Sequence, residues 1–416
     1  MVGMLGSSTQ PSCFAQFTRY CLFFPQNRFL ISASDVVEAT ANGETSHASR
    51  LQTKKKCLFT TEKALHNLIA EKISRHYKQE LSMVVDVRYQ NLQYWLAQQA
   101  PGTPQQITPL ANDASFRRYY RVHYPQHSLV LVDAPPAKEN SLPFIQIAQA
   151  LQQQDICVPQ IFAKDLQQGF LLISDLGDEL YLSAITHHDP DLLYQQAIDT
   201  LIKLQQCQTV NHPSLPVFGK RFIQRELNLF DQWFLQQQLQ LSLSPAEREL
   251  LTRTYQFLTT QIAQQPTVFT HSDFHSRNLL WTTTAQVGVI DFQDAMHGPI
   301  SYDLVSLLRD CYLVWPQHKI DQWIDYYLAA LAQMDFLPTV TREDFIYWFD
   351  LTGLQRHLKV LGVFARLNIR DNKPRYLADI PRILEYIVRV GQKYPEMNDL
   401  LSFIHQHVWD QLPNEH

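Results

Sequence analysis

The sequence predicts an α+β fold of two lobes, a small β-rich N-lobe at 83–177 and a large, mostly helical C-lobe at 178–416. Three observations favour this fold class. Short apolar runs between polar turns, which are typical of strands, are concentrated in the first lobe. Long segments with apolar residues at helical spacing dominate the second. Within that second lobe, a polar loop with chemically versatile side chains follows a short apolar run near residue 270.

The composition is that of an ordinary globular protein, with 45% hydrophobic and 18% charged residues. A chain of 416 residues is long enough for two or three domains or lobes. No apolar run reaches the ~18 residues that a membrane span needs. The net charge of −5 argues against general nucleic-acid binding. The six cysteines are scattered without a C-x-x-C pair, which predicts reduced thiols in a cytoplasmic protein.

Residues 1–82 are expected to form an extension outside the fold, disordered or partly helical. They show no sustained apolar period, and only 62–79 has the spacing of a short helix. The beginning also lacks the basic start, longer apolar core and small-residue cleavage site of a secretory signal. Regular amphipathic pattern begins directly after Met83.

The N-lobe is predicted to run from a helix through strands to a second helix and further strands. The first helix, 84–98, places Val87, Leu92 and Trp95 at helical spacing. The strands expected after it are 106–110, 116–122, 129–132, 161–163 and 170–173, with a helix at 141–153 between the third and the fourth. This order predicts one small sheet that carries a helix.

The C-lobe is predicted to be helical around a small sheet. Ser244 is a candidate N-cap, because its hydroxyl can accept a backbone N–H in the first turn of the following helix. The helices expected are 191–206, 220–240, 245–264, 302–314, 318–334, 342–367 and 381–390.

The chemistry is expected in the stretch that carries His271, Asp273 and Asn278 at the spacing H-x-D-x-x-x-x-N, followed thirteen residues later by Asp291. Such a spacing suits a short loop between two strands, so that the side-chain oxygens converge. In phosphoryl transfer from ATP, one carboxylate orients or deprotonates the attacking hydroxyl. An amide oxygen and a second carboxylate hold Mg²⁺ against the phosphates. The pattern predicts Asp273 as the base and Asn278 and Asp291 as metal ligands.

Two further residues are expected to support this loop. Asp303 stands at a predicted helix start, where a carboxylate can accept free backbone N–H groups. His271 is more plausible as a structural hydrogen-bonding residue than as an acid or base.

With these residues, the chain resembles the aminoglycoside phosphotransferase and choline kinase superfamily over about 84–410. The longer strings resemble bacterial sugar kinases that phosphorylate the anomeric hydroxyl of N-acetylmuramate and N-acetylglucosamine during peptidoglycan recycling. The matching segments are 114–122, 132–136, 275–279, 291–295, 298–310 and 355–367. The resemblance implies a two-lobed protein-kinase-like fold, ATP and Mg²⁺ as cofactors, a small amino sugar as partner, and a monomer or weak oligomer.

On the nucleotide side, the sequence departs from the general kinase pattern. There is no G-x-G-x-x-G, and the third strand ends in Asp133 where a lysine would contact the phosphates. The helix that follows offers no glutamate to pair with such a lysine. The candidates for the missing cation are Arg117, Arg118, Arg121 and Lys138, and an arginine of the second strand is favoured. We expect Ser115, Arg117 and Arg121 to contact the phosphates and Asp175 and Leu176, in the hinge at 174–177, to contact adenine.

For the sugar, the resemblance draws attention to the residues beside the base. His275, Arg277, Gln293 and Asp294 are candidates for contacts with hydroxyls or phosphate. Arg356 and Arg366 belong to a basic helix, and an arginine fork would suit the lactyl carboxylate of muramate. That helix is also compatible with a solvated face. The alternatives are a kinase of an aminoglycoside, choline or homoserine, and an inactive nucleotide-binding module.

Overall fold

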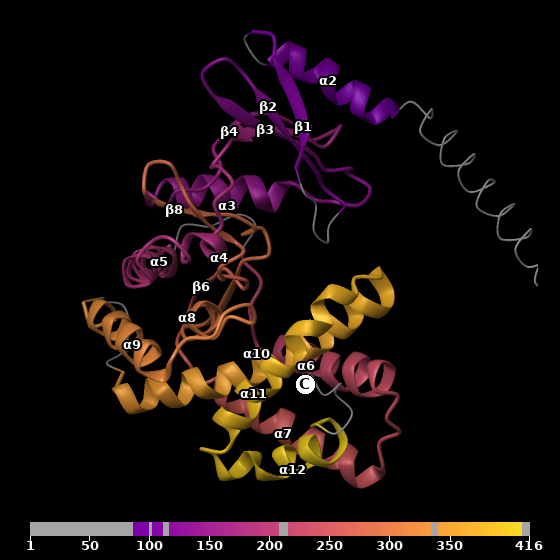
Figure 1. Cartoon of the computed structure of the whole chain (residues 1–416), viewed down its shortest axis with the longest axis vertical. Coiled ribbons are helices and arrows are strands. Elements are labelled where there is room, and N and C mark those ends of the chain that lie inside the picture. The colour runs from indigo at the N-terminus through magenta and orange to yellow at the C-terminus, as the bar shows by residue number, and fades with distance from the viewer. Residues whose placement is uncertain (1–85, 100–101, 111–115, 208–214, 334–339, 410–416) are drawn as a thin grey trace, which may run out of the picture. The chain divides into compact units, whose positions relative to one another are not determined.

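The computed structural model describes residues 86–99, 102–110, 116–207, 215–333 and 340–409 (Figure 1). The expected extension at 1–82 and Ser115 lie outside the described residues, so the extension and the phosphate contact of Ser115 stay predictions. Within the described part of the chain, no helix is long and apolar enough to cross a membrane.

The N-lobe contains one antiparallel sheet in the order β1-β2-β3-β5-β4. Its strands are β1 (Gln106–Pro109), β2 (Arg118–His123), β3 (Ser128–Asp133), β4 (Ile161–Asp165) and β5 (Phe170–Ser174). Because side chains alternate between the faces of a strand, β3 buries Leu131 on one side of the sheet and Val130 and Val132 on the other.

Each face of this sheet is covered by a helix (Figure 1). Leu92 and Trp95 of α2 (Val87–Gln99) pack against the Leu131 face. On the Val130 and Val132 face, α3 (Leu142–Gln152) contributes to a core that continues into the C-lobe. The sequence therefore predicted both helices and all five strands, with their ends shifted by only a few residues.

The C-lobe is mostly helical, with two short two-stranded antiparallel sheets. Antiparallel pairing joins β6 (Thr267–Thr270) to β9 (Met296–Pro299) and β7 (Leu279–Trp281) to β8 (Val287–Val289). The helices are α4 (Tyr181–Ala184), α5 (Pro190–Gln205), α6 (Lys220–Leu229), α7 (Pro245–Ile262), α8 (Tyr302–Leu308), α9 (Gln317–Leu331), α10 (Arg342–Asp371), α11 (Ile380–Gly391) and α12 (Asn398–His407), with short 3-10 turns at Pro374–Asp379 and Pro395–Met397.

Ser244 caps α7 as expected, in a capping box with Glu247. Two helix predictions need correction. The single helix expected at 220–240 changes at Phe230 into a π-helix, η1 (Phe230–Gln238). The helix expected at 302–314 ends at Leu308, because the Asp310 carboxylate accepts the backbone N–H groups of Tyr312 and Ser276, and this turns the chain away from the helix axis.

Helix α10 is the central element of the C-lobe and packs against η1, α6, α7, α8 and α11. Gly362 allows α10 to approach the end of α6, where η1 begins. A Cβ at this position would lie 2.3 Å from the carbonyl carbon and oxygen of Leu229. Since those atoms belong to the backbone, the two helices can relieve the overlap only by moving apart.

We therefore expect Gly362→Ala to lower the free energy of unfolding by about 1–3 kcal/mol, the usual cost of overpacking. This loss would appear despite the higher helix propensity of alanine. Gly219→Ala is the matched control, because the nearest atom to its added Cβ is 3.7 Å away. Urea denaturation of both variants measures the difference. Equal stability of the two would contradict the predicted clash.

Candidate active site

The predicted catalytic residues lie in two loops, which the pairing of β6 with β9 and of β7 with β8 brings together. The loop 271–278 joins β6 to β7, and the loop 290–295 joins β8 to β9. Because β6 pairs with β9 and β7 with β8, both loops leave neighbouring strands in the same region. The backbone N–H of Ile290 donates to the carbonyl of Asn278 at 3.1 Å, and the amide nitrogen of Asn278 lies 3.5 Å from Asp291 Oδ2.

His271 connects the two loops. Its Nε2 lies 3.0 Å from the carbonyl oxygen of Ile290, which can only accept, so Nε2 carries the proton. The unprotonated Nδ1 then accepts the backbone N–H of Asp273 at 3.3 Å. Both ring nitrogens are used in holding backbone, which suits the supporting role expected for His271.

Asp303 of α8 holds the beginning of the same loop. Its carboxylate accepts the backbone N–H groups of His271 at 2.6 Å and Ser272 at 3.0 Å. Burial raises the pKa of Asp303 to about 6, although His271 and the two backbone N–H groups oppose this rise. The buried position and these bonds are what its predicted role as a brace requires.

Two residues of the loops have left-handed backbone, with φ of +79° at Ser272 and +66° at Asp291. Residues other than glycine rarely adopt such angles, and the strain is concentrated at functional sites. Here the strained residues are the neighbour of the predicted base and a predicted metal ligand. The backbone bonds to Asp303 and Ile290 described above are positioned to hold this arrangement.

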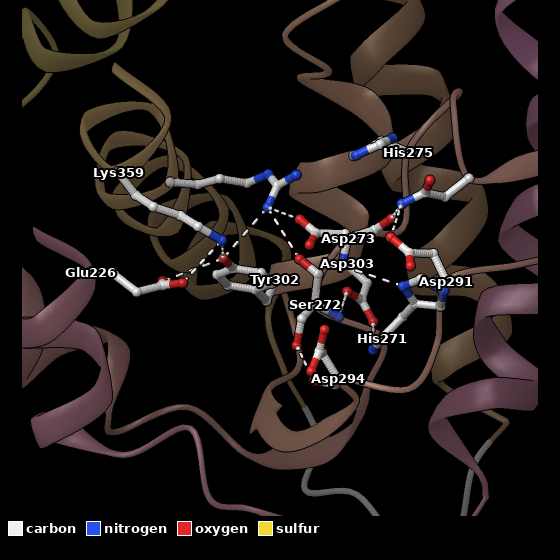
Figure 2. Close-up of polar contacts among 12 residues, drawn as sticks. Glu226, His271, Ser272, Asp273, His275, Asp291, Asp294, Tyr302, Asp303 and Lys359 are labelled. Carbon is white, nitrogen blue, oxygen red and sulfur yellow. Dashed lines mark hydrogen bonds and ion pairs between the residues drawn. The ribbon is translucent and has the colours of Figure 1, made fainter. Parts of the chain in front are cut away.

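The side chain of Asp273 is 45% exposed and lies beside cations from α10 (Figure 2). Its Oδ1 is 3.6 Å from Nη1 of Arg356, which also donates to the carbonyl of Ser272 at 3.2 Å. Burial by itself would raise the pKa of Asp273, but the charges of Lys359 and Arg356 outweigh it and hold the pKa below its usual value. The carboxylate is therefore deprotonated and ready to accept a proton at neutral pH.

Next to Arg356 lie three residues that the sequence analysis did not assign to the site, namely Lys359, Glu226 and Tyr302. Lys359 Nζ lies 2.9 Å from Glu226 Oε1 and donates to the hydroxyl of Tyr302 at 3.2 Å. The i, i+3 spacing of Arg356 and Lys359 on one helix face was a usable signal for Lys359. Glu226, on α6, had no signal, because only the tertiary fold brings it to α10.

Asn278 and Asp291 offer the oxygen types that Mg²⁺ prefers, one amide and one carboxylate. The Asn278 amide is oriented by a 2.9 Å bond from its nitrogen to the backbone oxygen of Asp273. Gln293, expected at the substrate, instead donates from Nε2 to Asp291 Oδ1 at 2.7 Å and so orients the second carboxylate. The donor set fits Mg²⁺, with Gln293 as a neighbour of the ligands.

Of the four candidate cations in the N-lobe, Arg117 is placed best. It is buried and pairs with Glu139, with Nε 3.3 Å from Oε2. Burial and the carboxylates of Asp291 and Asp273 raise the pKa of Asp294, and the charge of Arg117 opposes this rise. Arg117 is therefore close to the carboxylates of the second loop. The sequence showed no glutamate in the helix after the third strand that could pair with a phosphate-contacting cation. In the structure Glu139, just before α3, pairs with Arg117.

The other candidates are engaged elsewhere. Arg118 and Arg88 donate to the fully buried Asp133, at 2.8 and 2.6 Å, so this carboxylate is paired with two arginines. Lys138 lies over the ring of Phe116, 5.1 Å from its centre. These contacts explain how the sheet accommodates an acidic residue at the end of β3.

The assignment of Arg121 to the phosphates needs correction. Its guanidinium donates to Asp175 at 2.6 Å and to Asp178 at 2.5 Å, and these bonds raise its pKa. Asp175 also accepts from the Ser128 hydroxyl at 2.6 Å. Arg121 thus holds the hinge to β2, and the Asp175 side chain is used within the protein. Leu176, the other hinge residue, lines a surface pocket beside Trp281.

The remaining candidates for contacts with the substrate lie at different distances from Asp273. His275 and Arg277 both contact Tyr312, His275 edge to face at 5.6 Å and Arg277 with its guanidinium 3.6 Å from the ring centre. Asp294 lies in the second loop, three residues after Asp291. Arg366 follows Arg356 by ten residues on α10, about 15 Å along the helix. The structure therefore does not bring Arg366 to Asp273, which does not support its predicted contact with the sugar.

Comparison with known proteins places these residues in a family context. The model of the phosphotransferase enzyme family matches residues 106–343. An N-acetylmuramate/N-acetylglucosamine kinase of Pseudomonas putida is 40% identical over 330 residues, covering 77% of this chain and 96% of that protein. A protein of the same name from Neisseria meningitidis serogroup B is 37% identical and covers 77% and 96%.

Solved structures share the fold at much lower identity. A spectinomycin phosphotransferase in complex with ADP and spectinomycin has a TM-score of 0.54 and 13% identity, covering 73% of this chain and 98% of that one. A choline kinase from Streptococcus pneumoniae has a TM-score of 0.50 and 10% identity, covering 72% and 99%. These similarities confirm the two-lobed kinase-like fold expected from the sequence.

Proposed function

Because the chain belongs to the phosphotransferase enzyme family, we propose that it is an ATP-dependent kinase of the anomeric hydroxyl of N-acetylmuramate, N-acetylglucosamine or both. The relatives that cover most of the chain carry the name of this activity. The reaction would return cell-wall sugars to precursor synthesis in the cytoplasm, where ATP is available.

The observation that carries the proposal is the position of Asp273. Figure 2 shows this half-exposed side chain between Asp291 on one side and Lys359 on the other. The Asn278 amide lies beside Asp291, and the Arg356 guanidinium lies beside Asp273. A hydroxyl that approaches from solvent can reach this carboxylate. A phosphoryl donor held at the neighbouring oxygen donors would be next to the same hydroxyl.

In this mechanism Asp273 orients the sugar hydroxyl and accepts its proton as the phosphoryl group is transferred. An anomeric hydroxyl is more acidic than a simple alcohol, so a weak base that is well positioned is sufficient. The lowered pKa of Asp273 is compatible with this role, because positioning contributes more than basicity. His271 and Asp303 hold the loop and thus fix the direction of the carboxylate.

We assign the contacts with the nucleotide to the two loops and to Arg117, the residue just before β2. Asn278 and Asp291 would hold Mg²⁺, and Gln293 would keep the Asp291 carboxylate in place. The bound ion would neutralise charge on the phosphates. Arg117 would add a protein cation at the phosphates, and its pairing with Glu139 would keep its guanidinium fixed.

The surroundings of Asp273 also favour a neutral or anionic sugar over a polycationic antibiotic. An aminoglycoside pocket needs carboxylates that face the amines of the substrate. Here Arg356 and Lys359 flank the base, and the nearby Glu226 is already bonded to Lys359 and Gln355. Muramate differs from glucosamine by a lactyl carboxylate, which an arginine can bind by charge-assisted hydrogen bonds.

A panel of acceptors tests the proposal directly. We expect ATP turnover with N-acetylmuramate or N-acetylglucosamine and none above background with kanamycin, choline or homoserine, measured by ADP release. Removal of the anomeric hydroxyl, as in a 1-deoxy analogue, should abolish turnover. Phosphorylation of that analogue, or preference for an amine-rich or choline acceptor, would refute the proposed substrate.

Substrate choice gives a sharper prediction. If Arg356 receives the lactyl carboxylate, Arg356→Ala should reduce kcat/KM for N-acetylmuramate more than for N-acetylglucosamine. The expected difference is about ten- to a hundredfold, the value of a charge-assisted bond of roughly 1.5–3 kcal/mol. The ratio of the two sugars removes the common effect of disturbing Asp273 and Ser272, which Arg356 also contacts.

Arg366→Ala serves as the control, because this residue lies on the same helix but about 15 Å further along it. It should leave the ratio of the two sugars unchanged. An equal loss for both sugars in Arg356→Ala would show that Arg356 supports the loop and does not read the carboxylate.

A further inference from the structure

A group of metal-ligand side chains lies outside the active site, where the chain leaves the hinge. It consists of Glu179, four residues after Asp175, and of His187 and His188 in the turn between α4 and α5. The carboxylate oxygen and the imidazole nitrogens that could bind an ion all lie within 4.8 Å of one another. Glu179 Oε1 is 2.5 Å from Nε2 of His187 and 3.2 Å from Nε2 of His188.

A neighbouring hydroxyl orients the first histidine for this role. The hydroxyl of Thr186 donates its only proton to the carbonyl of Ser183 at 2.7 Å. The same oxygen lies 3.0 Å from Nδ1 of His187, so it can only accept there, and Nδ1 must carry a proton. Once Nε2 of His187 has lost the proton that it shares with Glu179, the neutral imidazole has its lone pair on Nε2, which faces that carboxylate. Metal-binding histidines commonly have their second nitrogen fixed in this way.

We propose that Glu179, His187 and His188 bind a divalent transition-metal ion, with Zn²⁺ as the preferred species. Two imidazoles and one carboxylate form a common ligand set for zinc, and a fourth position remains for water. The ion would take the place of the shared proton between Glu179 Oε1 and His187 Nε2. Magnesium prefers oxygen ligands, so the nitrogen donors separate this site from Asn278 and Asp291.

The site is connected to the hinge and to the strand that follows the catalytic loop. The carbonyl of Glu179 accepts the backbone N–H of Trp281 at 2.7 Å, and Trp281 is the last residue of β7. The ring of His188 lies 5.4 Å from the ring of Trp281. Both also line the surface pocket that contains Leu176 of the hinge. A bound ion would tie the segment after the hinge to the turn before α5 and stabilise this region.

The test uses the full chain, treated with a chelator and returned to buffer with excess MgCl₂, so that the oxygen-rich site is not available to zinc. Titration calorimetry with ZnCl₂ should show a binding event that the double variant His187→Ala, His188→Ala lacks. At about a hundredfold excess of Zn²⁺ over its Kd, the Tm of the unmodified protein should rise by roughly 3–4 °C. The double variant should show no such rise.

Two further variants refine the result. Thr186→Val keeps the size of the side chain but removes the acceptor for Nδ1, and it should weaken zinc binding by about tenfold. His407→Ala is the matched control, because His407 pairs with a single carboxylate, Glu247, at 2.9 Å. Its zinc affinity should equal that of the unmodified protein. Equal stoichiometry and affinity in the double variant, or displacement of zinc by magnesium, would overturn the proposal.

Discussion

Asp273→Asn is expected to lower kcat by at least about a hundredfold, the scale of a lost general base. The substitution keeps the shape of the side chain but removes its negative charge, and with it the ability to accept a proton. Arg356 retains its bonds to Ser272 and Tyr302 in the variant, so the fold should persist. Steady-state kinetics with the preferred sugar, together with Tm and ATP affinity, measure the effect.

Asp294→Asn is the control for this prediction, because Asp294 is a second carboxylate in the adjoining loop. Burial and the charges of Asp291 and Asp273 raise its pKa, which makes it a poorer candidate for a residue that must be deprotonated. We expect a smaller loss in this variant. If Asp273→Asn kept its activity while Asp294→Asn lost it, the assignment of the base would be wrong.

The features that the sequence predicted well are those encoded within short distances along the chain. The strands of the N-lobe follow from alternation, and the helices from apolar spacing. Asp273, Asn278 and Asp291 were predicted to converge because each adjoins a short strand, and pairing of those strands brings their loops together. The resemblance to the family, and with it the two-lobed kinase-like fold, was also inferred from the sequence around these three residues. The extension at 1–82 and the boundaries of the lobes stay predictions.

The features that could not be predicted depend on contacts between distant segments. Arg121 and Arg117 have the same chemistry and neighbouring positions, but the fold places Arg121 against Asp175 at the hinge and Arg117 against Glu139. Only the distances in three dimensions separate the arginine that we propose at the phosphates from the one that pairs with the hinge. Likewise, the sequence identified α10 as basic but could not show that Glu226 would neutralise Lys359.

Loss of the Asp291 carboxylate is expected to have a similarly large effect through the metal. Asp291→Asn is preferable to Asp291→Ala, because φ is +66° at this position and asparagine tolerates the left-handed region well. The variant therefore removes the charge with little change in backbone strain. A metal contributes several kcal/mol of charge stabilisation, so kcat/KM should fall roughly a hundredfold or more.

Asn278→Ala should be less severe, because it removes a neutral ligand and the bond to the backbone of Asp273. The two substitutions are distinguished by magnesium titration. Both should raise the Mg²⁺ concentration needed for half-maximal activity, with the larger shift for Asp291→Asn, since a carboxylate contributes a full charge to the ion. Gln293→Ala leaves both proposed ligands in place and loosens only the 2.7 Å bond to Asp291, so its shift should be the smallest. Activity of the unmodified enzyme that survives EDTA would remove both residues from the metal site, because neither could then act through a bound ion.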